Sequence, residues 1–81
     1  MQAISYFQHM TTKKSEEETI GQKIKKRRLA MDLTQEALAR KADIPYTTLV
    51  KIESDAVLNP SIDTVTKIAN GLEIGVDELI K

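Results

Sequence analysis

The segment from residue 33 to residue 54 constrains the fold most, because it predicts two short helices kept apart by a turn. Thr34 can cap the first helix with its side-chain oxygen, and Leu33 can pack against Leu38 one turn later as a hydrophobic staple. The first helix is expected to close near Ala42 and is therefore short.

A turn and a second helix follow. Pro45, the last residue of the sequence Asp43-Ile44-Pro45, forbids continuation of the preceding helix. The next helix is expected from Tyr46 to Ser54, with Leu49 and Ile52 turned inward. Two short helices across a tight turn predict a helix-turn-helix.

Further helices are predicted on both sides of this motif. Ser15 and Glu18 fit a capping box, which predicts a helix that starts at Ser15 and ends near Asp32. Ser61 can cap a fourth helix with one apolar stripe, and Gly75 can cap a fifth. No strand pattern is present in the sequence. We therefore expect an all-α, compact five-helix bundle whose second and third helices form the helix-turn-helix.

Composition excludes several classes of site. The chain of 81 residues is long enough for one domain, and without Cys it has no disulfide and no thiolate zinc site. His9 is the single His and cannot build a metal site alone, so we expect no metal and no cofactor. No Gly-rich phosphate loop or plausible catalytic carboxylate pair is present, so we expect no enzyme. No apolar run approaches the roughly 18 residues of a membrane span and no leader is present, so we expect a cytoplasmic protein that contacts no membrane.

The charge is unevenly distributed although the formal net charge is zero. Residues 20–53 carry eight basic side chains against four acidic ones, a net charge of +4, and the segments on both sides are acidic. A charge run alone more often marks a solvated helix face than a binding surface. The basic segment nevertheless coincides with the predicted motif, where an anionic partner could bind.

The residues themselves resemble a known family. The stretches LTQEALARKADIPYTTLVKIES and NPSIDTVTKIANGLEIGVDEL are similar to the phage repressor and Cro (XRE-type) family of helix-turn-helix proteins, and the resemblance covers residues 19–80. It implies a lambda-repressor-like domain that binds double-stranded DNA and regulates transcription, with repression the expected outcome. The positions that match the family pattern are Thr34, Gln35, Leu38, Ala39, Ile44, Leu49, Ile52 and Glu53.

The outward face of the third helix is expected to read bases. An aromatic ring, methyl groups and one Lys suit a major groove, where thymine methyls offer apolar contact and Lys can donate to guanine. The family resemblance also implies base contacts at these positions. Helical geometry gathers four side chains there: Tyr46, Thr47, Val50 and Lys51.

Phosphate contacts are expected around this face. The free N–H groups at the start of the second helix lie at the positive end of its dipole, and Gln35 resembles the family's phosphate clamp. Thr34 either joins that clamp or serves as a cap only. The other candidates are Thr48, Ser54 and Asn59 beside the reading face, and Lys23 and Arg27, which add a positive field without sequence preference.

Arg28 is expected to be structural. The period set by Ile20 and Ile24 turns Arg28 inward, where an unpaired charge is costly. The family resemblance implies that Glu53 is its partner and that the pair links the first and third helices.

The sequence departs from the family pattern at the ends of helices. Four positions where the family commonly has Gly carry an acidic residue, and Asp tolerates a positive φ better than most residues do. The turns should survive at a modest cost in stability. These positions are Asp32, Asp43, Asp55 and Glu73.

The expected protein is a homodimer that places two recognition helices in successive major grooves. Val57 and Leu58 form either a subunit contact or a satellite of the core. An antitoxin with a toxin partner is the alternative function, and a restriction-modification controller also fits the length. We expect residues 1–14 to be a cloning remnant followed by a flexible arm, and residues 15–81 to form the DNA-binding domain.

Overall fold

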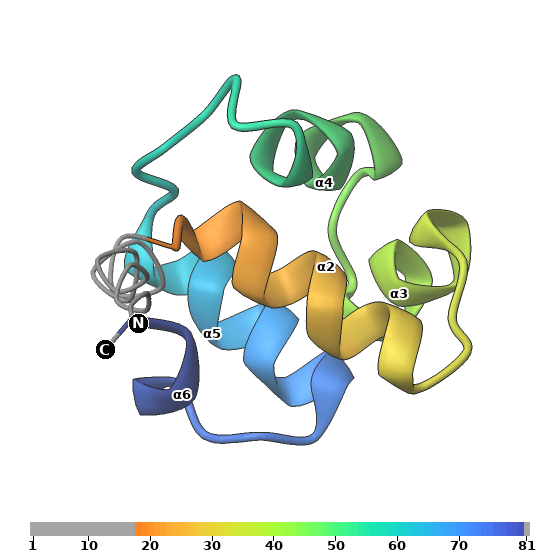
Figure 1. The fold of residues 1–81 in the computed structure, drawn as a ribbon. Helices are drawn as coiled ribbons and strands as arrows, with labels where there is room; N and C mark the ends of the chain where they lie inside the picture. Colours follow the sequence, from red (N-terminus) through yellow and green to blue (C-terminus); the bar gives the residue numbers. More distant parts are fainter. Residues whose placement is uncertain (1–17, 81) are drawn as a thin grey trace, which may run out of the picture.

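The computed structural model describes residues 18–80 of the chain, and in this part every regular element is a helix. Helices α2 and α5 lie at the centre, α4 packs against α2, α3 packs against α5 and α4, and α6 covers the opposite side of α2 (Figure 1). The predicted all-α class and the predicted five helices are confirmed for residues 18–80. The helices are α2 (Ile20–Ala30), α3 (Gln35–Ala42), α4 (Tyr46–Glu53), α5 (Ile62–Leu72) and α6 (Asp77–Ile80).

The start of α2 differs from the predicted one. Ser15 lies outside the described residues, but Glu18 and Thr19 are not helical, so a helix running unbroken from Ser15 was wrong. Thr19 is the N-cap instead: its Oγ1 accepts from the Gln22 amide, and the Gln22 side chain accepts from the Thr19 amide. This is a complete capping box one turn later than expected.

The caps of α3 and α5 are the predicted ones. The Thr34 hydroxyl accepts from the Ala37 amide at 3.0 Å, and the Ser61 hydroxyl accepts from the Thr64 amide at 3.2 Å. Each satisfies one of the N–H groups that a helix leaves unpaired at its first turn. Helix α4 ends at the predicted place, with Ser54 as its C-cap.

All five helices contribute to one core of buried apolar side chains. Two of its helix crossings depend on glycine. A Cβ at Gly21 would lie 2.0 Å from the backbone oxygen of Ile52, so α2 and α4 touch through bare backbone. A Cβ at Gly71 would lie 3.2 Å from the Cβ of Ala42, which explains a glycine inside α5 where α3 crosses it. The largest fully buried side chains are Ile24, Leu38, Leu49, Ile52, Ile68 and Leu72.

Four acidic residues have the left-handed backbone conformation that the sequence predicted for them. Their φ angles are 59° at Asp32, 59° at Asp43, 67° at Asp55 and 60° at Glu73. Asp43 and Glu73 are the C-caps of α3 and α5, and each donates its N–H back to carbonyls of the last helical turn. The helix ends are therefore closed as they would be with glycine, at the energetic cost of a side chain in this region.

Candidate nucleic-acid interface

Helix α4 has one buried face and one outward face. Leu49 and Ile52 point into the core, where they are almost fully buried. Tyr46, Thr47 and Lys51 are exposed, with 47% of Tyr46 accessible. Val50, the fourth expected base reader, is half-buried at the edge of this face. The structure thus brings the four side chains to one side of a short helix, and three of them are exposed.

A buried ion pair holds the C-terminal end of α4 against α2. Arg28 Nε lies 2.8 Å from Glu53 Oε2 and Arg28 Nη2 lies 3.0 Å from Glu53 Oε1, a two-pronged contact between side chains that are 9% and 2% exposed. Arg28 also donates from Nη1 to the Leu33 carbonyl at 2.7 Å. One guanidinium therefore joins α2, the turn before α3 and the end of α4.

Gln35 takes part in the same cluster. Its side-chain Nε2 donates to Glu53 Oε1 at 3.0 Å, so one of the two N–H groups of the amide expected to clamp phosphate is committed within the protein. The Thr34 hydroxyl is likewise engaged as the cap of α3. The start of α3 therefore offers a phosphate its backbone N–H groups, those of Gln35 and Glu36, for which the described part of the chain supplies no acceptor.

The two ends of α4 are held differently. Beyond its C-terminus, Asp55 Oδ1 accepts from the Thr19 hydroxyl at 2.8 Å, which ties this end to the N-cap of α2. At its N-terminus, Pro45 is the N-cap and makes no side-chain hydrogen bond. Polar contacts thus fix the end near Lys51, while the end that bears Tyr46 depends on the turn and on apolar packing.

Flanking polar residues border α4. Thr48 is half-buried, and with Lys51 and Asn59 it lines an open hollow of about 350 Å³ between α4 and the start of α5. Ser54 is exposed, but its hydroxyl donates to the Lys51 carbonyl at 3.2 Å. Thr48 and Asn59 therefore lie beside the outward face. Ser54 lies at the end of this face, and its hydroxyl proton is already used in the hydrogen bond to the Lys51 carbonyl.

The expected basic residues of α2 lie on the other side of the molecule. Lys23 and Arg27 line a hollow with Ile74, Glu78 and other residues next to α6, and Arg27 Nη1 lies 3.9 Å from Glu78 Oε1. The structure therefore does not bring Lys23 and Arg27 to the outward face of α4.

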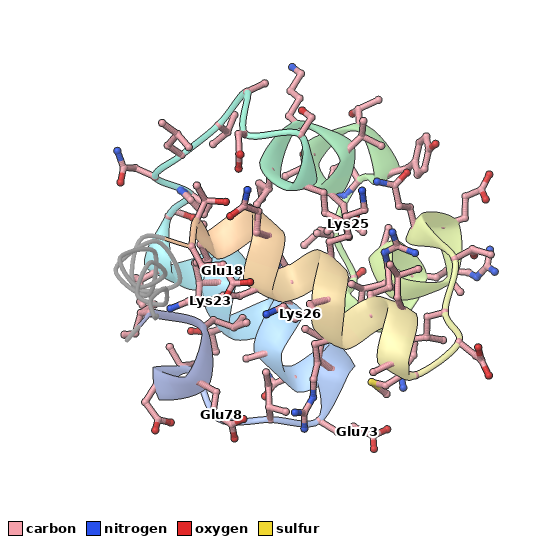
Figure 2. All side chains as sticks on the ribbon, in the orientation of Figure 1. Glu18, Lys23, Lys25, Lys26, Glu73 and Glu78 are labelled. Carbon is pink, nitrogen blue, oxygen red and sulfur yellow. The ribbon has the colours of Figure 1, made fainter. Side chains whose placement is uncertain are left out.

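Lys25 is the basic residue of α2 that lies toward α4 (Figure 2). It is exposed, and it follows Gly21 by four residues and precedes Arg28 by three, so it shares the side of α2 on which both meet α4. Sequence reasoning missed it because the rotation of α2 about its axis depends on the Gly21 contact with Ile52. The small residue at position 21 was the signal that could have revealed it.

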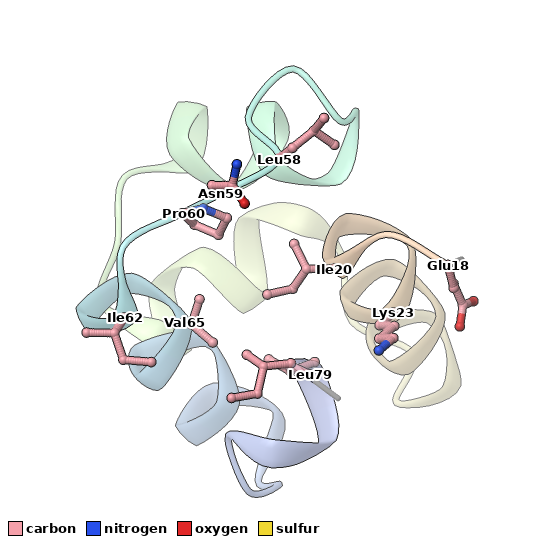
Figure 3. A pocket seen from close by; sticks show the side chains of 10 residues that line it. Glu18, Ile20, Lys23, Leu58, Asn59, Pro60, Ile62, Val65 and Leu79 are labelled. Carbon is pink, nitrogen blue, oxygen red and sulfur yellow. The ribbon is translucent and has the colours of Figure 1, made fainter. Parts of the chain in front are cut away.

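An apolar groove lies beside the loop that leaves α4 (Figure 3). It has a volume of about 390 Å³, and Leu58, Ile62 and Ile80 on its border are 56%, 65% and 57% exposed. Val57, in contrast, packs against the core. Of the two alternatives for this pair, Val57 is therefore a satellite of the core, and Leu58 is exposed and available for a subunit contact. No helix among residues 18–80 is long and apolar enough to cross a membrane.

The arrangement of α3 and α4 within this five-helix fold defines a helix-turn-helix domain, the fold of DNA-binding transcriptional regulators. The chain belongs to the helix-turn-helix family, whose model matches residues 24–79. The expected membership of the phage repressor and Cro type is thereby confirmed, and the family is one of DNA-binding regulators rather than enzymes.

Curated relatives include one phage regulator and one bacterial regulator. The immunity repressor protein of Bacillus phage phi105 is 40% identical over 62 residues, which cover 76% of this chain and 42% of the relative. The uncharacterized HTH-type transcriptional regulator RP766 of Rickettsia prowazekii (strain Madrid E) is 45% identical over 47 residues, which cover 54% of this chain and 51% of the relative. The matches thus span about half or less of these relatives' length.

Among solved structures, the crystal structure of SinR, the master regulator for biofilm formation, in complex with DNA has the same fold. The TM-score is 0.75 at 33% sequence identity, and the match covers 78% of this chain and 100% of that chain. The predicted lambda-repressor-like architecture is confirmed by this similarity.

Proposed function

We propose that this chain is a sequence-specific repressor that reads the major groove with α4 and acts as a homodimer. The observation that carries the proposal is the outward face of α4: its exposed side chains have no role in the core, while the buried side is fixed by Leu49, Ile52 and Glu53. A helix held in this way can enter a major groove without disturbing the fold. SinR, which shares this fold, was crystallised in complex with DNA, and the phi105 relative is an immunity repressor.

Different parts of the interface perform different tasks in this proposal. Lys51 donates to guanine, Tyr46 and Thr47 make apolar contact with thymine methyls, and Val50 contributes from the edge. The free backbone amides at the start of α3, those of Gln35 and Glu36, bind one phosphate. Further phosphate contacts come from Thr48, Asn59 and Lys25 near α4, with Lys23 and Arg27 adding to the long-range field.

The decisive experiment is selection of a binding site from random duplex DNA, followed by titration at several salt concentrations. We expect a selected duplex with an inverted repeat to bind about 10³-fold or more tightly than random duplex, since specific complexes commonly reach that ratio. Affinity should fall steeply with salt, because displaced counterions dominate the phosphate contacts. Equal affinity for selected and random duplex would reject the proposal and favour a protein partner such as a toxin.

We assign the dimer contact to the apolar groove, with a second copy of the chain as its occupant. Exposed Leu58, Ile62 and Ile80 gather there, and such a cluster on a small domain commonly marks an interface. The same groove is lined by Glu18 and Lys23, so two copies of this face meet without a net like-charge repulsion. The groove also adjoins the loop that follows α4, which supplies Leu58, Asn59 and Pro60 to its lining (Figure 3).

Sedimentation tests the dimer contact. Ile62→Glu should shift the protein toward the monomer, because it places a charge in the apolar contact. Leu29→Glu is the matched control, since Leu29 is 55% exposed on α2 and does not line the groove. If both variants sediment as the unmodified protein does, the contact lies elsewhere.

A further inference from the structure

The link between Gln35 and Glu53 joins the far ends of the two motif helices. Gln35 is the first residue of α3 and Glu53 the last of α4, and Gln35 Nε2 lies 3.0 Å from Glu53 Oε1. The turn from Asp43 to Pro45 already connects the near ends of these helices. Because α3 and α4 are connected at both ends, the angle between them is fixed, whereas a connection at the turn alone would allow that angle to change.

The contact is additional to the ion pair and does not duplicate it. Arg28 satisfies Glu53 with two N–H groups and ties it to α2 and, through the Leu33 carbonyl, to the turn before α3, while Gln35 ties Glu53 directly to the first residue of α3. The acceptor is a carboxylate whose side chain is 2% exposed, so water competes little for it. Hydrogen bonds to charged groups in such surroundings are the stronger ones.

We infer that Gln35 is a positioning residue, which acts through Glu53 to set the angle of α4 relative to the start of α3. A further consequence rests on the proposed function. The α3 amides that contact phosphate and the α4 side chains that contact bases keep a fixed position relative to each other. Gln35 then affects which bases are read, although its side chain touches no base. A side chain that bound phosphate directly would affect all sequences equally.

The variant Gln35→Met tests the inference, because Met has a similar length and lacks the donor. In the free protein, ¹H–¹⁵N spectra should show shifted amides from Lys51 to Ser54, with cooperative unfolding retained. Lys25→Met is the matched control: it removes an exposed side chain of α2 and should leave the amides of α4 in place. If Gln35→Met does not unfold cooperatively, Gln35→Asn replaces it, since its shorter side chain keeps the amide but cannot reach Glu53.

Binding to the selected duplex and to its single-base variants gives the second measurement. Gln35→Met should reduce discrimination at the base pair that Lys51 contacts by roughly threefold to tenfold, the range expected from the net contribution of one ordinary hydrogen bond. Lys25→Met should weaken all duplexes alike and reduce the salt dependence. Unmoved α4 amides, or a uniform loss of affinity like that of Lys25→Met, would overturn the inference. If the unmodified protein shows no sequence preference, the proposed function fails, and the amide shifts still decide whether Gln35 positions α4.

Discussion

Tyr46, Thr47 and Lys51 differ in what each can offer to a base pair. Lys51 is a compact cation with three donors on a flexible stem, so it recognises acceptor atoms such as guanine O6 and N7. Tyr46 and Thr47 present mainly ring and methyl surface beside a hydroxyl, which suits thymine methyls. Lys51 also lies at the end of α4 that Glu53 and Asp55 fix, so its stem starts from a well-defined position.

Replacing Lys51 is expected to relax the preference at one base pair. Lys51→Ala should cost about 1–3 kcal/mol at the selected site, because a directional donor to guanine is lost. Binding titrations against duplexes that vary each position in turn would locate the affected pair. Thr48→Ala provides a flanking control, which should alter affinity without changing the preferred base. A Lys51→Ala protein with an unchanged preference would show that Lys51 binds phosphate only.

Gly21 is expected to tolerate no side chain. In Gly21→Ala the new Cβ would meet the Ile52 backbone oxygen at 2.0 Å, so α2 and α4 must separate. We expect a loss of about 1–3 kcal/mol or more in the free energy of unfolding, as for other overpacked sites. Gly75→Ala is the control, because its Cβ would meet only the end of the Asp77 side chain, which can rotate away. Urea unfolding of both variants measures the difference, and equal stabilities would contradict the close α2–α4 contact.

At the scale of the elements, the ends of the helices show what the sequence could predict. Asp43 and Glu73 were expected to take a positive φ from their place at the ends of α3 and α5, and both do so. The local requirement is strong there, because the chain must leave the helix within one residue, which a residue in the left-handed conformation allows. The prediction rested on the resemblance, because the family commonly has Gly at these positions.

The start of α2 was not predictable in the same way. Ser15 with Glu18 and Thr19 with Gln22 are equally good capping boxes one turn apart in the sequence. What distinguishes Thr19 is a tertiary contact, since its hydroxyl also donates to Asp55, 36 residues away. Local pattern carries no information about that partner.

The candidate site could also be predicted only where local pattern determines it. The face of α4 follows from 3.6-residue periodicity once the helix is known, so Tyr46, Thr47 and Lys51 could be selected in advance. The side of α2 on which Lys23 lies could not, because a sum of charges along the chain does not tell which way a helix is rotated. Gly21 decides that rotation, through its contact with Ile52.

The C-cap of α5 allows a test of backbone strain. Glu73 has φ 60° and its carboxylate lies 3.1 Å from Lys41 Nζ in an exposed pair, which contributes little. Both Glu73→Gly and Glu73→Ala remove this pair, but only Gly adopts the left-handed conformation freely. We expect the Gly variant to be more stable than the Ala variant by about 1 kcal/mol, the cost of a Cβ in this conformation. Thermal unfolding compares the two, and an Ala variant of equal or higher stability would contradict the cap geometry.

At the scale of the whole molecule, zero net charge conceals an uneven distribution. The side next to α6 carries Glu18 and Glu78 beside Lys23 and Arg27, so acidic and basic groups mix there, while Lys25 and Lys51 are exposed on the side that bears α4. Exposed cations on one face orient the molecule in the field of a polyanion without making it bind every anion strongly. In the proposed dimer, the orientation of each copy also depends on how the two copies are joined.

The spacing of half-sites tests the proposed dimer. Insertion of about 5 bp between the two halves of the selected site turns them to opposite faces of the duplex, so only one α4 can bind at a time. Affinity should then fall to that of an isolated half-site. Insertion of about 10 bp restores the facing but lengthens the distance, and serves as the control for altered sequence. Gel-shift titration measures all three, and an affinity independent of spacing would indicate that the copies bind separately.

The division of α4 into a buried side and an exposed side has a consequence for the evolution of such a protein. Leu49, Ile52 and Glu53 are buried and support the fold, whereas Thr47 and Lys51 are exposed and Tyr46 is about half covered. Under the proposed function, mutations on the outer side are therefore filtered more by the operator than by foldability. A lineage with this arrangement can acquire a new target through a few exchanges on one helix, while the rest of its architecture is inherited unchanged.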